Sequence, residues 1–434
     1  MLFVIVAILA LALVVNPGHV TLSGRIVAVF CFFCCLTFAV FLAQGGRMPE
    51  MGSLAPMVSL EAGLLTAHGL QAVMLLCLAA FMSYTSREYA LEDKGAHIAL
   101  DSLPIITGLL AVYATLAALY IIYTLGIGTV LSYQGYGTIK ALHDIYIENP
   151  LGKLVAGTFR FVVLVLIAAA ILALNNRRHD ILALCLVPIA LAFLLGIAEA
   201  SRIIAVYCAL FAIGFYLIER KVLAVSAAIG AVVLIGYVLE ARSHPQLGLS
   251  QFPRYFAASL SEPGYLWSII SNAFASLLVT SAAADAAYPG AYDLSYKILS
   301  FSPTIGAIDG FQDVRVLYEQ RISYSVPFNA FGEAWAFGIP YYVLFWAILF
   351  VGAYCVNSSL RFGKAPFLLL LAAFVIGLMF ASQYPVRNSV RYFYALILAR
   401  FALGFVMDAL TRNALRARGP ARSRHLQGRR PGRR

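Results

Sequence analysis

Long apolar runs separated by short polar segments make up most of this sequence, from its first residues to about residue 410. About eleven of them reach or approach the roughly 17–25 residues that a helix needs to cross a bilayer. The pattern predicts membrane-spanning helices at residues 2–15, 25–44, 67–84, 104–124, 156–175, 181–198, 203–218, 222–240, 338–356, 366–384 and 391–410. We therefore expect an all-α, polytopic integral membrane protein.

One polar interruption is far longer than the others and comes late in the chain, at residues 241–337. It is rich in Arg, Tyr, Ser, Pro and Gly. Within it, Tyr265–Ala284 is apolar but contains Ser, Thr and Asn, which is typical of a re-entrant or interfacial helix rather than a full span. The sequence thus predicts one large loop that carries short helices.

Composition supports this reading, because 62% of the residues are apolar and only 12% are charged. The formal net charge of +11 lies mostly in residues 411–434, which contain Arg but neither Asp nor Glu. Such a segment stays in the cytoplasm and contacts anionic lipid. It lacks the interleaved aromatic residues that favour nucleic-acid binding. We predict a transmembrane domain at residues 1–410, a disordered cytoplasmic tail at 411–434, and a long loop on the outer side.

Several kinds of chemistry are not expected. The chain has no Gly-rich phosphate loop, no H-E-x-x-H motif and no paired Asp in D-x-D spacing. All seven cysteines lie in apolar runs, where packing thiols are the ordinary use. The sequence therefore predicts neither a metal site nor a cofactor.

Charged residues at the turn Glu199-Ala200-Ser201-Arg202 interrupt two apolar runs at membrane depth. Such charges are costly and usually face protein or a water-filled cavity. Two interpretations are open. Glu199 and Arg202 can neutralise each other as a salt bridge that caps the turn, or Arg202 can bind an anion on the outer side.

A second group of candidate residues ends the long loop, where Arg321, Asn329 and Glu333 precede the ninth apolar run. Arg254 and Arg315 lie in the same loop, and Arg387 lies in the outer turn before the last run. The planar guanidinium group suits phosphate, with which it forms two charge-assisted bonds. The tyrosines of the loop suit sugars. The competing interpretations are a solvated loop with incidental charges and a surface that contacts anionic lipid head groups.

Taken together, these features resemble bacterial O-antigen polymerases (Wzy), the oligosaccharide repeat-unit polymerases of the O-antigen polymerase and ligase superfamily. The likeness covers nearly the whole chain. It rests on the number of helices, on Ser201-Arg202 entering a helix, on the large late loop, and on a passage similar to the family's N-x-x-G-E…G pattern (Asn329, Gly332, Glu333, Gly338). Arg321 and Gly332 match the family's Arg-x10-Gly spacing, whereas Arg202 and Gly214 are one residue too far apart.

The resemblance implies an enzyme of the bacterial inner membrane that joins glycans carried on undecaprenyl pyrophosphate at the periplasmic face, without metal or nucleotide sugar. It assigns pyrophosphate binding to Arg202 and Arg321, and the role of base or sugar-positioning group to Glu333. Substrate contacts are expected from Arg254, Arg315, Asn329, Arg387 and Glu199. The implied partners are the lipid-linked glycans, membrane lipids and a chain-length regulator.

Two alternatives remain open. The first is a ligase that uses the same donor; that group is described with a catalytic His in the late loop, where this chain has only His244, at the loop's start. The second is a transporter or flippase of sugars or lipids. A fixed external site lined by Arg would favour the polymerase, and alternating access through the bundle would favour transport.

Overall fold

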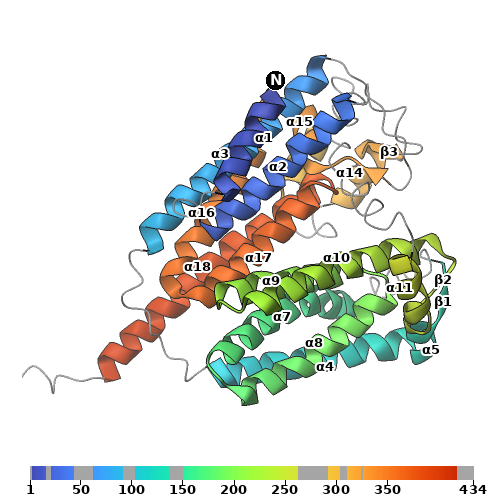
Figure 1. Cartoon of the computed structure of the whole chain (residues 1–434), viewed down its shortest axis with the longest axis vertical. Coiled ribbons are helices and arrows are strands. Elements are labelled where there is room, and N and C mark those ends of the chain that lie inside the picture. The colour runs from blue at the N-terminus through green and yellow to red at the C-terminus, as the bar shows by residue number, and fades with distance from the viewer. Residues whose placement is uncertain are drawn as a thin grey trace, which may run out of the picture.

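The computed structural model describes residues 2–15, 21–43, 62–90, 103–135, 150–261, 292–303, 310–323 and 326–417. Helices make up nearly all of this part of the chain (Figure 1). The long helices are α1 (Leu2–Val15), α2 (Leu22–Ala43), α3 (Ala62–Ala90), α4 (Leu103–Leu125), α7 (Pro150–Asn175), α8 (His179–Ala198), α9 (Ile203–Leu217), α10 (Lys221–Ser243), α16 (Ile339–Ser358), α17 (Lys364–Ala381) and α18 (Val386–Ala417). The short elements are α5 (Ile127–Leu131), β1 (Tyr133–Gln134), β2 (Gln246–Leu247), η3 (Leu249–Gln251), α11 (Phe252–Ser261), α13 (Leu294–Ser300), α14 (Phe311–Tyr318), β3 (Arg321–Ser323), β4 (Val326–Pro327), α15 (Ala330–Ala336) and η4 (Ser359–Phe362).

Each apolar run that the sequence predicts as a span coincides with a long helix. Within the described residues, seven helices are long and apolar enough to cross a membrane: α2, α3, α4, α7, α8, α10 and α16. Three more apolar helices, α1, α9 and the apolar part of α17, are shorter. The all-helical, multi-pass membrane class is thus supported, whereas the expected count of about eleven spans is not confirmed.

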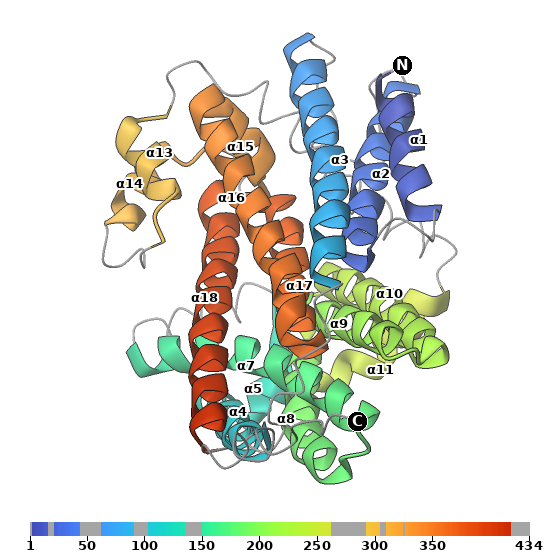
Figure 2. The ribbon, with the colours of Figure 1, turned by 90° about the vertical axis from the view of Figure 1, so that its left-hand side faces the viewer.

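A first helical bundle is formed by α1–α3 and α16–α18, which lie side by side in Figure 2. Its core includes Phe38, Leu75, Trp346 and Phe393, all buried, and it extends into the late loop through aromatic residues of α13, α14 and α15. A second bundle contains α4, α7, α8, α9 and α10, and the axes of the two bundles cross in Figure 1.

Helix α17 belongs to both cores. Phe367, Leu371 and Phe374 face the first core, whereas Leu368, Ala372 and Ile376 contribute to the second. Residues three or four apart lie on one face of a helix, so these two sets form separate stripes. The position of α17 therefore fixes the second bundle against the first.

Three tight turns connect the helices of the second bundle, and each contains a non-glycine residue with positive φ. These residues are Arg177 (φ 55°), Ala200 (φ 45°) and Glu219 (φ 63°). L-residues rarely adopt this left-handed conformation, so surrounding contacts must hold it in place. Ala200 is fully buried and comes two residues before Arg202.

The late loop carries short helices, as the sequence predicts. Figures 1 and 2 place α13, α14 and α15 near the end of the first bundle at which α1 begins. The apolar segment Tyr265–Ala284 lies outside the described residues. Helix α18 continues to Ala417, into the segment predicted as the tail, and residues 418–434 lie outside the described part.

Candidate functional site

The site is built around α15, a short helix whose beginning is set by Asn329. The side-chain Oδ1 of Asn329 accepts a hydrogen bond from Gly332 N (2.9 Å), and its backbone oxygen accepts one from Glu333 N (2.9 Å). An Asn at this position satisfies backbone N–H groups that the helix itself cannot bond. Asn329 is fully buried and caps α15, and its expected contact with substrate stays a prediction.

Glu333 follows in the first turn of α15 and is only 1% exposed. Its Oε1 accepts a hydrogen bond from Tyr296 Oη (2.9 Å), and its Oε2 accepts one from Val386 N (2.6 Å). Val386 begins α18, where the first N–H groups of the helix have no partner within it. One carboxyl group thus joins the loop helices α13 and α15 to a helix of the bundle.

Burial raises the pKa of Glu333 from about 4.5 to about 7, against the opposing effect of the two hydrogen bonds. Desolvation wins because it penalises the charged form of a carboxyl group that has lost its water shell. The same burial, together with the nearby Glu333, raises the pKa of Tyr296, which keeps the phenol protonated as a donor.

Arg387 is the second buried charge at this place and is 2% exposed. Its guanidinium carbon lies 3.9 Å from the ring centroid of Phe311, and its Nη1 donates to Leu299 O. Phe311 in turn stacks on Tyr296 with a centroid distance of 5.7 Å. Arg387 therefore holds α13 and α14 against the start of α18, which is a positioning role.

Arg202 approaches the same turn from the second bundle. Its Nη1 donates to Gln383 Oε1 (2.7 Å), and the two residues are 181 positions apart. Gln383 precedes Val386 and Arg387 in the 382–387 turn, which comprises the connection between α17 and α18 and the first two residues of α18. Unlike Glu333 and Arg387, Arg202 is only half-buried. The structure thus brings Arg202, Glu333 and Arg387 to this one turn.

Glu199 receives a contact that sequence reasoning missed. Its Oε2 lies 3.3 Å from Arg160 Nη2, with 11% of the Glu199 side chain exposed. Arg160 lies within the apolar helix α7, and a lone Arg at such a position is the signal that should have marked it. The positive charge of Arg160 partly neutralises the carboxylate of Glu199.

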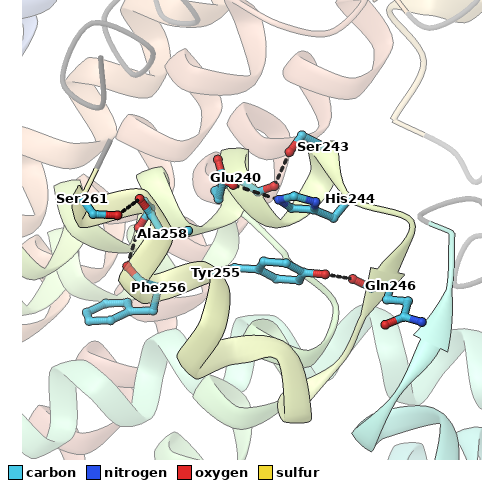
Figure 3. A network of polar contacts seen from close by, with 9 residues as sticks. Glu240, Ser243, His244, Gln246, Tyr255, Phe256, Ala258 and Ser261 are labelled. Carbon is cyan, nitrogen blue, oxygen red and sulfur yellow. Dashed lines mark hydrogen bonds and ion pairs between the residues drawn. The ribbon is translucent and has the colours of Figure 1, made fainter. Parts of the chain in front are cut away.

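The end of α10 forms a further polar network, shown in Figure 3. His244 Nε2 lies 2.8 Å from Glu240 Oε1, and the imidazole stacks on Tyr255 at 4.5 Å. Tyr255 Oη donates to Gln246 O (2.8 Å). Sequence reasoning used His244 only to weigh the ligase alternative and did not anticipate this network.

Arg242 connects this network to the turn that carries Arg202, because its Nε donates to Ala200 O (3.0 Å). Arg254 lies on α11, exposed, with its guanidinium carbon 5.8 Å from the ring of Tyr255. The expected substrate residue Arg254 therefore belongs to this network at the end of α10, and no described contact joins it to Glu333.

The remaining expected residues lie in the loop. Arg315 Nε forms an ion pair with Glu319 Oε2 (2.9 Å) within α14. Arg321 lies in β3, opposite Pro327 of β4 in an antiparallel pair, and its side chain is outside the described part of the structure. Its expected convergence with Arg202 therefore remains a prediction. The described residues contain no group of three or more His, Cys, Asp or Glu that could hold a metal ion.

No protein-family model matches the chain, and neither a curated protein nor a solved structure matches it.

Proposed function

We propose that this protein is an integral membrane glycosyltransferase that polymerises oligosaccharide repeat units carried on undecaprenyl pyrophosphate. The observation that carries the proposal is the gathering of Arg202, Glu333 and Arg387 at the 382–387 turn. Arg202 reaches Gln383 from the second bundle, and Arg387 follows Val386, whose N–H binds the Glu333 carboxyl group that ties down the late loop. An anionic leaving group such as pyrophosphate is the ligand that this charge favours.

In the proposed reaction, a hydroxyl oxygen of one repeat unit attacks the anomeric carbon of the growing chain. The new C–O bond forms as the bond between the anomeric carbon and the pyrophosphate oxygen breaks, and the hydroxyl proton passes to a base or to water. Undecaprenyl pyrophosphate leaves with its charge partly balanced by Arg202 and Arg321. Cationic side chains can supply this stabilisation without a metal ion.

Of the two roles expected for Glu333, base or sugar-positioning group, its contacts favour the positioning role. Because both carboxyl oxygens are already bonded, the residue is suited to hold the loop and thereby position substrate. Arg387 and Asn329 support the same loop, because Arg387 contacts α13 and α14 and Asn329 caps α15. Arg254 and Arg315 are proposed as peripheral contacts to substrate.

The proposed topology has about eleven spans, the late loop on the periplasmic side of the bacterial inner membrane, and the Arg-rich tail in the cytoplasm. The placement of α13–α15 near the start of α1 is compatible with the expected external N-terminus. A chain-length regulator is the proposed protein partner. The orientation itself rests on the distribution of positive charge.

Complementation of a deletion strain tests the proposal. Loss of long glycan chains, with single repeat units still reaching the outer side, is the expected phenotype. Polymer that accumulates on undecaprenyl pyrophosphate would instead indicate a ligase, and repeat units trapped in the cytoplasm would indicate a flippase. An unchanged glycan profile would refute all three assignments. Gels and mass spectrometry of lipid-linked intermediates separate these outcomes.

Variants then test the arginines. Arg202→Ala and Arg321→Ala are expected to abolish polymer synthesis while the protein remains in the membrane. Arg202→Lys is expected to retain only part of the synthesis, because the ammonium point charge of lysine replaces the planar guanidinium group of arginine. Arg178→Ala is the matched control. Arg178 forms an ion pair with Asp180 (2.9 Å) at the start of α8 and has no role in the proposed site. Long chains made by Arg202→Ala would contradict the role of Arg202.

A further inference from the structure

Helices α13 and α14 of the late loop expose large apolar side chains, although neither helix lies in a predicted span. On α13, Leu294 and Ile298 are 61% and 56% exposed, and on α14, Val316 and Leu317 are 83% and 74% exposed. Residues four apart lie on one face of a helix, so Leu294 and Ile298 form an apolar outer face on α13. Apolar surface of this kind marks an interaction with a membrane or with another protein.

The inner faces of the same two helices are packed and hydrogen-bonded. Tyr296 of α13 is buried, donates to Glu333 Oε1 and stacks on Phe311 of α14 at 5.7 Å. Tyr292 is also buried, with its ring 4.9 Å from that of Phe337. Figure 2 shows α13 and α14 side by side next to α15. The two helices therefore present their apolar side chains from a fixed position.

One side of α16 shows where lipid lies beside this loop. Its exposed large apolar residues are Ile339, Val343, Leu344, Val351 and Tyr354. Their spacing places them on one side of the helix. The rest of α16 packs inside the bundle, and near its end Asn357 donates to Met82 O and Thr85 Oγ1 (both 2.6 Å). Because α16 is long and apolar enough to cross a membrane, its exposed apolar side faces acyl chains.

Helix α13 lies against the beginning of α16. Lys297 Nζ is 5.7 Å from the ring centroid of Tyr341, and the ring of Phe301 lies 6.0 Å from that of Tyr341. Tyr341 belongs to the first turn of α16, between the exposed Ile339 and Val343. The apolar surface of α13 thus continues the lipid-facing side of α16.

The length of α16 indicates the depth at which α13 lies. The apolar segment Ile339–Phe362 has 24 residues, which corresponds to about 36 Å of helix. The hydrocarbon core of a bilayer is only about 30 Å thick, so the first turn of α16 reaches the boundary with the head groups. Tyrosines such as Tyr341 are enriched at this boundary. Lys297 suits the same depth, because its stem can cover apolar surface while its ammonium group stays at the head groups.

We propose that α13 and α14 insert their exposed apolar side chains into the leaflet in which α16 begins, and so anchor the late loop to the membrane. The phospholipid of that leaflet is the partner, because the surface of α13 is continuous with the side of α16 that faces acyl chains. This anchor is independent of the proposed glycosyl transfer. Since Tyr296 and Glu333 join α13 to α15, it would also hold α15 at the membrane surface.

Tryptophan quenching in proteoliposomes tests the anchor. Ile298→Trp and Leu317→Trp each add one tryptophan to the three of the wild type, at exposed positions that have room for the larger ring. Lipids brominated along their acyl chains are expected to lower the fluorescence of the added tryptophan about two-fold, because an interfacial helix buries its apolar face by about 5–10 Å. Gln246→Trp is the matched control, since Gln246 is an exposed residue of β2; its tryptophan should respond to aqueous acrylamide instead.

Quenching of the tryptophans at positions 298 and 317 by acrylamide alone would overturn the proposal, because the surface would then face water. Protection from both quenchers would also overturn it, because another segment of the chain, a second copy or a partner protein would then cover the surface. Equal quenching of Gln246→Trp by the brominated lipid would remove the distinction between the loop helices and the control, and would count against the anchor. Leu317→Trp keeps the test valid if Ile298→Trp does not fold, which size-exclusion chromatography checks.

Discussion

Replacing Glu333 with glutamine is expected to abolish the pH dependence that this residue gives to the stability of the protein. A carboxyl group whose pKa rises from about 4.5 to about 7 on folding binds its proton more tightly in the folded state. The resulting stabilisation is complete below pH 4.5 and is lost as the pH rises through 7. The difference corresponds to about 3 kcal/mol between these limits.

The geometry explains why glutamine can take the place of the protonated acid. A protonated Glu333 can donate to Tyr296 Oη, while its other oxygen still accepts from Val386 N–H. A glutamine amide makes the same two bonds, so Glu333→Gln is expected to be close to neutral at acidic pH. Glu333→Ala leaves two buried partners unsatisfied and is expected to lower the free energy of unfolding by about 3 kcal/mol.

Thermal unfolding in detergent from pH 5 to 8, followed by tryptophan fluorescence, measures the effect, and Trp335 lies two residues from Glu333. The melting temperature of the wild type should fall with rising pH, whereas that of Glu333→Gln should stay flat. Asp180→Asn, which removes a carboxylate from the ion pair with Arg178 at the start of α8, should keep the slope of the wild type. Equal slopes for wild type and Glu333→Gln would refute the reasoning.

Three other substitutions test the turns and the buried polar contacts. Ala200→Val places a β-branched residue at φ 45° and should lower the melting temperature, at a cost of about 2 kcal/mol; an unchanged value would contradict the strained turn. Gly248→Ala brings a Cβ within 2.4 Å of Leu131 O at φ 116°, and faster proteolysis within residues 126–135 is expected. Asn357→Ala removes two donated hydrogen bonds, at a cost of about 2 kcal/mol, which chemical denaturation in mixed micelles measures; a cost near zero would count against the network.

The sequence alone predicted where the long helices lie, because an apolar run of sufficient length has few alternatives to a helix in a membrane. It also predicted short helices in the late loop, and it singled out Glu333 as an acid beside an apolar run. For Asn329 the sequence predicted a contact with substrate and did not predict its use in the fold. An Asn three residues before a Gly-Glu pair also fits a helix cap, and the structure shows that use.

Only the tertiary structure decided which of these residues meet. The helices are apolar on all sides, so the sequence does not reveal which face packs inward and which faces lipid. Arg202 and Gln383 are 181 residues apart, and the bond of Glu333 to Val386 depends on where α18 begins. Arg160 and Glu199 likewise meet only because α7 packs beside α8 and α9. Local patterns determine the helices, whereas contacts between distant segments depend on how those helices pack.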